Sequence, residues 1–200
     1  NTKESVQENN TENQVANTQT NNETNNESEE NNMYSTGKHH AKIVVKNYGT
    51  IALELDADVA PITVENFANL VNEGFYNGLT FHRIISGFMI QGGDPLGNGT
   101  GGSSKTIKGE FASNGVKNSI SHVRGTISMA RSSMPNSASS QFFIVHKDST
   151  FLDGQYAAFG TVTNGMDVVD KICADTAVED DNGTVAKNNQ PVIEKITMID

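Results

Sequence analysis

The residue types that could do chemistry are concentrated in residues 81–94, FHRIISGFMIQGGD. If the first half of this segment is a strand, side-chain alternation places Phe81, Arg83 and Ile85 on one face. An arginine on an apolar face has two explanations. Its stem covers apolar surface while its guanidinium reaches water, or the guanidinium is held at the edge of an apolar pocket as a rigid donor of hydrogen bonds. The second explanation makes Arg83 a candidate functional residue.

Two other segments combine aromatic and polar residues in a similar way, residues 139–145 (SSQFFIV) and 151–160 (FLDGQYAAFG). Taken singly, each pattern is typical of a buried core. These two segments therefore indicate a functional site only if they form one pattern together with residues 81–94.

Residues 97–102 (GNGTGG) match the glycine pattern of a dinucleotide site. Such a site needs a strand before the glycines, a helix after them and an acidic residue about 20 positions further on. No helical pattern follows, and position 117 is Lys117. We therefore expect a flexible glycine loop that borders a cleft and not a nucleotide site.

Metal and hydrolase chemistry find little support in the spacing of the remaining residues. No two histidines have the i, i+4 spacing of a helical zinc pair, and the single cysteine has no partner, so we predict no metal site. A Ser-His-Asp hydrolase is harder to exclude because a triad forms in space. However, no G-x-S-x-G motif occurs, and the serines crowd into loop-like residues 132–140. The histidines and the cysteine are His39, His40, His82, His122, His146 and Cys173.

The charge of the chain is unevenly distributed. The chain has 24 acidic and 14 basic residues, a net charge of −10, and residues 1–32 account for six of these charges through seven Glu and one Lys. Those residues include 11 Asn and no aromatic residue, Leu, Ile or Met. Such a segment cannot bury enough apolar surface to offset the entropy of ordering. We predict a disordered acidic tail over residues 1–36 and one domain over residues 37–200.

The composition also excludes several classes of partner and location. A pI near 4.9 without a Lys/Arg cluster argues against nucleic acid as a partner. No apolar run reaches the roughly 18 residues that would predict a transmembrane helix, and one cysteine excludes an internal disulfide.

Hydrophobic periodicity predicts many short strands and two helices. Pro61 can open a helix because its missing N–H costs nothing in the first turn, and Val64, Phe67 and Val71 give that helix an apolar face up to Gly74. A second helix is expected over residues 166–174. Gly, Ser, Asn and Pro clusters separate the strand-like runs, which favours a mainly β fold, a closed antiparallel barrel. These runs are residues 42–46, 50–55, 79–85, 88–91, 125–130, 141–146, 157–162 and 192–199.

Taken together, the unusual segments resemble the cyclophilin family of peptidyl-prolyl isomerases. The segments FHRIISGFMIQGGD, GNGTGG, GTISMARS, PNSASSQFFI and FLDGQYAAFG occur in the order and spacing of that family. The resemblance covers about residues 41–200. It implies a closed eight-stranded antiparallel β-barrel capped by two α-helices, and an enzyme that rotates X-Pro peptide bonds and assists protein folding.

The resemblance also assigns expected roles by matching position. The essential arginine of the family falls on Arg83, with Gln91 beside it as a second catalytic residue. The residues expected to bind substrate are His82, Phe88, Met89, Gly99, Thr100, Ala130, Arg131, Gln141, Phe143, Phe151, Leu152 and Tyr156. Among these, Phe88, Met89, Phe143, Leu152 and Tyr156 match the proline pocket.

Three positions depart from the commonest family pattern. Phe151 stands where most members carry the tryptophan that contacts cyclosporin, which implies weakened cyclosporin binding more than weakened catalysis. Tyr156 replaces a histidine that often lines the pocket, as in bacterial members. Arg131 replaces an asparagine and adds a charge at the rim.

The implied reaction explains why no nucleophile, metal or proton shuttle was found. Amide resonance sets a rotation barrier of about 18–20 kcal/mol, and no bond is made or broken. A donor aimed at the amide nitrogen favours the twisted state, so no cofactor is expected. The expected partners are proline-containing peptides and folding proteins, bound by a monomer. The rival interpretation is a non-catalytic binder of proline peptides on the same scaffold.

The acidic tail also bears on location. A flexible coil of 32 residues reaches about 30 Å, so the tail can serve as a hydrated spacer. We therefore expect an extracellular or surface-tethered protein, processed from a lipoprotein, in preference to a cytoplasmic one.

Overall fold

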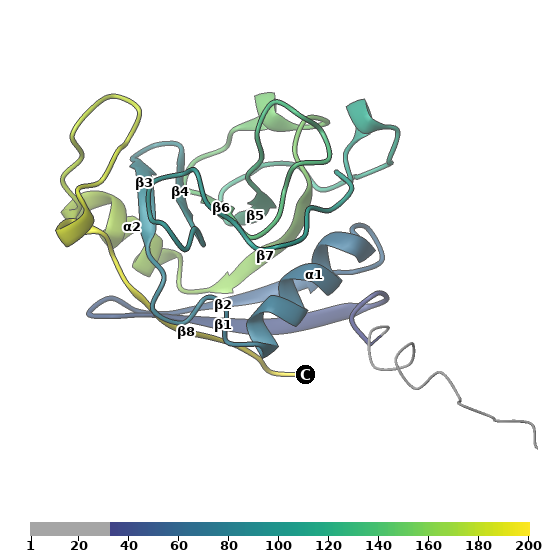
Figure 1. The fold of residues 1–200 in the computed structure, drawn as a ribbon, viewed down its shortest axis with the longest axis horizontal. Helices are drawn as coiled ribbons and strands as arrows, with labels where there is room; N and C mark the ends of the chain where they lie inside the picture. The colour runs from purple at the N-terminus through teal and green to yellow at the C-terminus, as the bar shows by residue number, and fades with distance from the viewer. Residues whose placement is uncertain (1–32) are drawn as a thin grey trace, which may run out of the picture.

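The structure, a computed structural model, describes residues 33–200, and they form one β-sheet with two α-helices (Figure 1). The prediction of a disordered tail lies largely outside the described residues. The boundary near residue 37 and the expected location stay predictions. The strands are β1 Lys38–Val45, β2 Gly49–Asp56, β3 Phe81–Ile85, β4 Met89–Gly92, β5 Thr126–Met129, β6 Phe142–Val145, β7 Ala158–Asn164 and β8 Ile193–Met198. The helices are α1 Pro61–Asn72 and α2 Met166–Asp175, and three short 3₁₀ turns lie at Ala112–Asn114, Thr150–Leu152 and Lys187–Asn189.

The expected strands and helices are all present, with small shifts at their ends. The largest difference is the start of β1, which was expected at residue 42 and begins at Lys38. Its first residues pair with β2, since Lys38 lies opposite Asp56 and His40 opposite Glu54. Local periodicity could not reveal this extension because the added residues, KHHA, carry no alternating apolar pattern.

The eight strands form one antiparallel sheet in the order β3-β4-β6-β5-β7-β2-β1-β8. The prediction of a closed barrel is wrong, because the two ends of this order, β3 and β8, share no ladder. They are joined by an isolated bridge between Thr80 and Val192 and by three backbone hydrogen bonds beside it. The donors and acceptors are the Gly78 N–H and the Ile193 carbonyl, the Ile193 N–H and the Leu79 carbonyl, and the Phe81 N–H and the Pro191 carbonyl. The sheet therefore curls into an open barrel.

The barrel stays open because another segment occupies the outer edge of β3. The Ile84 N–H donates to the Gly183 carbonyl (2.9 Å), and the Val185 N–H donates to the His82 carbonyl (3.1 Å). A strand edge can pair with one neighbour only, so β8 cannot continue along β3. The segment over residues 183–185 follows α2 and forms one wall of the site described below.

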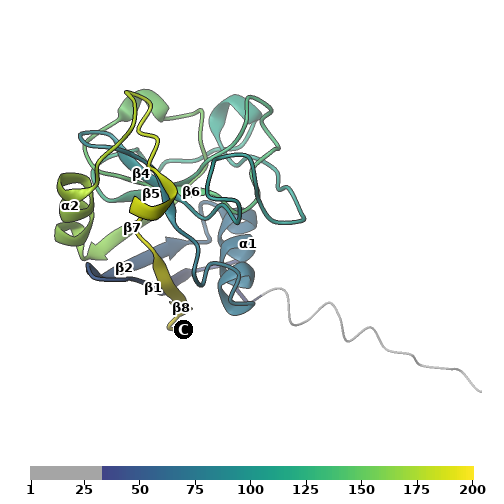
Figure 2. The ribbon, with the colours of Figure 1, turned by 60° about the vertical axis from the view of Figure 1, so that its left-hand side comes forward.

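The two helices cover opposite ends of the curled sheet, α2 on the left and α1 on the right of Figure 2. Helix α1 begins at Pro61 and ends at Asn72, and the N–H of the following residue, Glu73, donates to the Asn69 carbonyl. Its apolar face includes Phe67, which contacts the rings of Tyr76, Phe142 and Phe159 at centroid distances of 5.3–5.7 Å. Neither helix in residues 33–200 has the length and apolar character needed to span a membrane.

Candidate functional site

A small apolar cluster lies apart from the main core, on the curled sheet. Met89, Phe143, Val145 and Leu152 are buried in it, and Ile85, Phe88, Ala130 and Tyr156 pack against them. The Phe143 and Tyr156 rings meet edge to face at 5.9 Å. We call Phe88, Met89, Phe143, Leu152 and Tyr156 the apolar pocket. All five were predicted from the sequence to lie together, and they do.

The register of the sheet places Arg83 directly beside this pocket. Arg83 lies opposite Gln91, and Gln91 lies opposite Phe143. Because directly opposed residues point to the same face of a sheet, these three side chains form one row. The Arg83 Nε donates to the Asn182 carbonyl (2.8 Å), Nη2 donates to the Asn182 Oδ1 (3.1 Å), and Nη1 donates to the Gln91 Oε1 at a longer 3.4 Å. The guanidinium is therefore held in place from two sides.

A chain of amides fixes which end of Gln91 faces Arg83. The Gln141 Nε2 donates to the Gly99 and Gly101 carbonyls (3.1 and 2.7 Å), and its Oε1 accepts from the Gln91 Nε2 (2.9 Å). With its amide nitrogen engaged in this way, Gln91 presents Oε1 to Arg83. The glycine loop of residues 97–102 thus orients the arginine through two glutamines.

Asp94 holds that glycine loop in shape. This carboxylate is 1% exposed and accepts backbone N–H groups from Leu96, Asn98 and Gly99 at 2.6–3.2 Å. Burial on its own would raise the pKa of Asp94, but the backbone donors outweigh it, so the net pKa lies below the usual range. Asp94 is consequently charged near neutral pH, and its negative charge stabilises the backbone N–H groups of the loop that donate to it.

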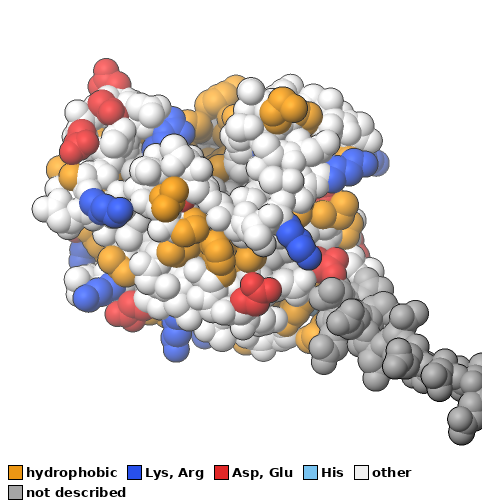
Figure 3. Space-filling view, viewed as in Figure 1, with side chains coloured by type: hydrophobic (Ala, Val, Ile, Leu, Met, Phe, Trp, Pro, Cys, Tyr) orange, Lys and Arg blue, Asp and Glu red, His pale blue; other side chains and the backbone are white. Residues whose placement is uncertain are grey.

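Most predicted site residues line a single cavity of about 620 Å³. Figure 3 shows the surface hollowed at the top, between two lobes, with apolar side chains at its edge. Thr100 and Gln141 line an adjacent cavity of about 220 Å³, whereas Phe151 lines neither. Phe151 is 72% exposed and its ring lies 5.6 Å from that of Phe88. The predicted residues in the larger cavity are His82, Arg83, Phe88, Met89, Gln91, Gly99, Ala130, Arg131, Phe143, Leu152 and Tyr156.

Arg131 belongs to the segment after β5, which forms one end of the cavity. Its guanidinium lies between the rings of Phe111 and Tyr156, 4.8 and 4.7 Å from their centroids. Its Nη2 and Nε donate to the Gln155 carbonyl at 2.6 and 3.1 Å. This stacking fixes the Tyr156 side of the pocket and places a charge at its rim.

The turn that carries Phe88 is tied down by His146. The Gly87 N–H donates to the His146 Nδ1, and the His146 N–H donates to the Phe88 carbonyl, both at 2.8 Å. The His146 Nε2 lies 3.0 Å from Asp170 on α2, which Arg124 also binds with two bonds of 2.7 Å. Because Nδ1 accepts a hydrogen bond, the ring proton is on Nε2 and is donated to Asp170.

Comparison with known proteins identifies the family of this chain. The model of the cyclophilin type peptidyl-prolyl cis-trans isomerases matches residues 40–198. The chain belongs to the cyclophilin family. A probable peptidyl-prolyl cis-trans isomerase of Brucella suis is 47% identical over 157 residues, which is 72% of this chain and 76% of that protein. A peptidyl-prolyl cis-trans isomerase of Helicobacter pylori is 50% identical over 128 residues, or 63% of this chain and 76% of that protein.

A solved structure agrees with these relatives. The cyclophilin type isomerase of Cryptosporidium parvum, crystallised in the presence of the dipeptide Ala-Pro, is 31% identical with a TM-score of 0.71. The match covers 80% of this chain and 99% of that one. This cyclophilin is therefore a peptidyl-prolyl cis-trans isomerase, with eight antiparallel strands and two helices.

The cyclophilin also contains a Ser-His-Asp hydrogen-bond chain that its sequence did not reveal. The His122 Nδ1 lies 2.8 Å from Asp153, and Nε2 lies 2.9 Å from the Ser128 Oγ. Burial lowers the pKa of His122 although Asp153 acts to raise it. Ser128 is fully buried on β5, so no substrate reaches it. The His122 ring stacks on Phe143 at 6.0 Å and supports the apolar pocket.

The other histidines of the cyclophilin are spread over the fold. His40 bonds to Asp200 (2.8 Å) and lies 3.4 Å from Glu54, and His39 contacts the Thr36 carbonyl. Within residues 33–200, no three His, Cys, Asp or Glu side chains converge as a metal site would require.

Sequence reasoning missed the segment over residues 179–187, which forms a wall of the cavity. Glu179, Asn182, Thr184, Val185 and Lys187 all line it. The only local signal was Asn182-Gly183, which is typical of a turn. Nothing in that dipeptide indicates that the turn pairs with β3, more than 90 residues earlier in the chain.

Proposed function

We propose that Arg83 accelerates rotation about the X-Pro bond by favouring the twisted amide over the planar one. In the twisted state the amide nitrogen lone pair leaves conjugation and accepts a hydrogen bond. A guanidinium held by Asn182 and Gln91 can donate to it without reorganising first. One observation carries the proposal: a fixed arginine opens into the same cavity of about 620 Å³ as the apolar pocket.

The apolar pocket supplies the complementary part of this mechanism. Met89, Phe143 and Leu152 are at most 7% exposed, and they offer a prolyl ring a dry, preformed surface. Low local polarity strengthens the contact between Arg83 and the amide. A rate increase of about 10⁵ requires about 7 kcal/mol of selective stabilisation, which is more than one hydrogen bond supplies, so ring binding and water exclusion contribute as well.

We infer that the substrates are proline-containing segments of peptides and of proteins that are still folding. The segment after β5, with Ala130 and Arg131, borders the same cavity. Strands β4 and β6 separate β5 from the Arg83 strand, and the segment can pair with the backbone of the residues before the proline. Gly99 and Gln141 lie next to this edge. The exposed Phe151 ring offers an apolar contact at the mouth, smaller than the tryptophan common in the family.

The experiment is an isomerisation assay on the Arg83→Ala variant, using a protease-coupled readout on an Ala-Pro-Phe peptide. Removing a preorganised donor to a transition state costs about 10²–10³ in rate, so kcat/KM should fall by about that factor. The Arg83→Lys variant keeps the charge and loses the fork, so it should recover only part of the activity. The melting temperature of both variants checks that the fold is intact.

The rival function, a binder without catalysis, predicts a different result. Wild-type protein would then bind a proline peptide without increasing its cis-trans exchange rate in an NMR exchange experiment. Wild-type activity in a folded Arg83→Ala variant would refute the mechanism proposed above.

A further inference from the structure

The turn between β3 and β4 carries Phe88 to the edge of the apolar pocket. The Phe88 N–H donates to the Ile85 carbonyl at 2.9 Å, and Gly87 has a φ of 83°. This combination is typical of a type II turn, in which glycine tolerates the positive φ. The Gly87 N–H belongs to the central peptide of the turn and has no acceptor inside it, so its partner comes from another segment.

His146, directly after β6, supplies that acceptor. The Gly87 N–H donates to the His146 Nδ1 at 2.8 Å. Turns of type I and type II differ by a rotation of the central peptide, which turns its N–H to the opposite side. An acceptor at a fixed position therefore selects one of the two turns, and with it the backbone conformation directly before Phe88.

Helix α2 determines which nitrogen of His146 carries the proton. The His146 Nε2 lies 3.0 Å from a carboxylate oxygen of Asp170 on this helix. A neutral imidazole has one N–H and one lone pair, so a ring that donates from Nε2 to the carboxylate accepts at Nδ1. The other tautomer would place two acceptors face to face at Asp170 and two donors face to face at Gly87.

Arg124 keeps the Asp170 carboxylate charged and in place. Its Nη1 and Nη2 each donate to one carboxylate oxygen at 2.7 Å, and Nη1 also donates to the His146 carbonyl at 3.0 Å. The hydrogen bonds from Arg124 hold the pKa of Asp170 below its usual range. Asp170 is therefore an anion near neutral pH, and it can accept from His146 as well as from Arg124.

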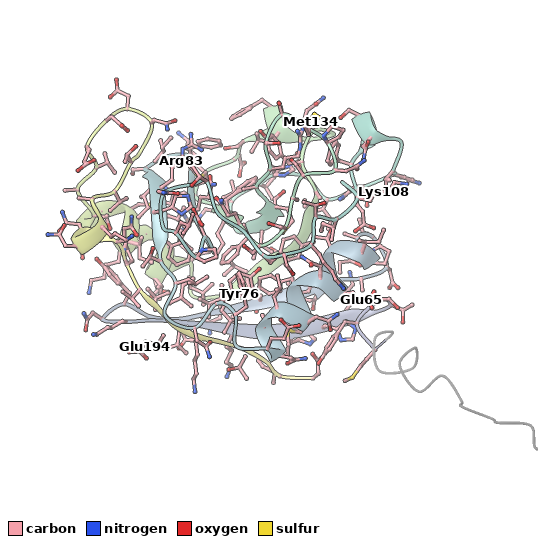
Figure 4. The ribbon with its side chains drawn as sticks, viewed as in Figure 1. Glu65, Tyr76, Arg83, Lys108, Met134 and Glu194 are labelled. Carbon is pink, nitrogen blue, oxygen red and sulfur yellow. The ribbon has the colours of Figure 1, made fainter. Side chains whose placement is uncertain are left out.

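The helix and the turn are neighbours in the fold. Figure 4 shows α2 in the same half of the molecule as Arg83, on the left of the view. Cys173 of α2 and Ser86 of the turn line a common cavity of about 240 Å³. The path from the helix to the turn therefore consists of two hydrogen bonds, one from His146 to Asp170 and one from Gly87 to His146.

We propose that Asp170 is a positioning residue for proline binding, because it keeps the His146 Nδ1 an acceptor and so fixes the turn that presents Phe88 to the substrate. This proposal rests on the proposed function of the apolar pocket. Neither Asp170 nor His146 lines the cavity of about 620 Å³, so both act on the substrate only through the turn. Phe88 contacts the prolyl ring equally in the planar and the twisted amide, and loss of such uniform binding raises KM without lowering kcat.

The test measures kcat and KM of the Asp170→Asn variant by NMR exchange on an Ala-Pro-Phe peptide. Asparagine offers one acceptor oxygen in place of two, so either Arg124 or His146 then faces an amide nitrogen. We expect KM to rise about twofold, the size typical of a partly exposed charged pair, and kcat to stay unchanged. Asp170→Glu keeps the carboxylate and should recover part of the loss.

Asp167→Asn is the matched control, since it removes a carboxylate from the first turn of α2 that has no side-chain partner within residues 33–200. It should change neither constant. In a His146→Ala background, Asp170→Asn should have no further effect on KM, because residues that act through one another are not additive. A merely structural role would instead lower the melting temperature and the active fraction, and with it kcat, at an unchanged KM.

The nitrogen NMR resonances of the imidazole ring report the tautomer directly. In wild-type protein, His146 should carry its proton on Nε2 alone. Asp170→Asn should produce a mixture of tautomers and an upfield shift of the Gly87 amide proton. An unchanged KM, an unchanged tautomer, or an equal rise in KM in the His146→Ala background would overturn the role of Asp170 and leave the isomerase mechanism standing. No acceleration by wild-type protein would instead overturn the proposed function.

Discussion

The hydrogen bonds from Gln141 to Gln91 and from Gln91 to Arg83 lead to a specific prediction for the Gln141→Met variant. Methionine is similar in length to glutamine but cannot accept the hydrogen bond that the Gln91 Nε2 now donates (2.9 Å). Gln91 then loses the partner that fixes its orientation, and its amide can turn so that Nε2 faces the Arg83 guanidinium. Two donors facing each other give Arg83 no acceptor on this side.

The size of the effect follows from the bonds involved. The lost amide bond contributes about 1 kcal/mol, and a bond to a charged group contributes about 1.5–3 kcal/mol. The bond from Arg83 to Gln91 is long, at 3.4 Å, and the two bonds to Asn182 remain, so the lower end applies. We expect kcat/KM to fall by about 10-fold, which corresponds to about 1.4 kcal/mol, and KM to change little.

The assay is the protease-coupled isomerisation of an Ala-Pro-Phe peptide, with Gln91→Leu and the double variant as a cycle. If Gln141 acts through Gln91, the double variant is no slower than Gln91→Leu alone, because coupled residues are not additive. Independent, multiplicative losses would refute the relay. So would a folded Gln141→Met variant with wild-type kcat/KM.

Two further predictions concern the residues that hold the pocket in shape. His146→Ala removes the acceptor of the Gly87 N–H, so kcat/KM should fall about threefold and the free energy of unfolding should fall by about 1 kcal/mol. His146→Asn keeps an acceptor and should lose less of both. Equal losses in the two variants would contradict this role of His146. Asp94→Asn should lower the free energy of unfolding by about 2–3 kcal/mol, since three backbone donors lose a charged acceptor. Because the pKa of Asp94 is lowered in the folded state, its full contribution to the free energy of unfolding is present above the ordinary aspartate pKa of about 3.9. That contribution is lost as the pH falls through the folded-state pKa of Asp94. Thermal melts from pH 6 to pH 2 should therefore converge for the two proteins at the acid end, and curves that stay parallel would exclude this role.

The apolar pattern alone was enough to predict most of the secondary structure. Helix α1 starts at Pro61 and ends beside Gly74 as expected, because Pro and Gly act locally on the backbone. The strands β2 to β8 were found within a few residues, since alternation and turn signals are local too. The extra residues of β1 were missed because pairing with β2, and not their own sequence, makes them a strand.

The residues of the site were likewise predicted where a local motif contains them and missed where only distant segments bring them together. The motif FHRIISGFMIQGGD identified Arg83, Gln91 and the first pocket residues, and the resemblance to a family brought in residues as far away as Tyr156. It did not reveal Asn182, which reaches Arg83 through a segment that pairs with the edge of β3. Nor did it reveal the buried hydrogen-bond chain from Ser128 through His122 to Asp153, whose members lie on three separate segments.

By itself, the sequence determined the order of strands and helices along the chain, the uneven charge and the family of this isomerase. These depend on residue type and on spacing within a few turns or one strand. The tertiary structure decided that the barrel stays open, which amide end of Gln91 faces Arg83, and that Asn182 binds the guanidinium. Each of these depends on which distant segments come into contact, and a sequence pattern with a period of two or 3.6 residues carries no information about that choice.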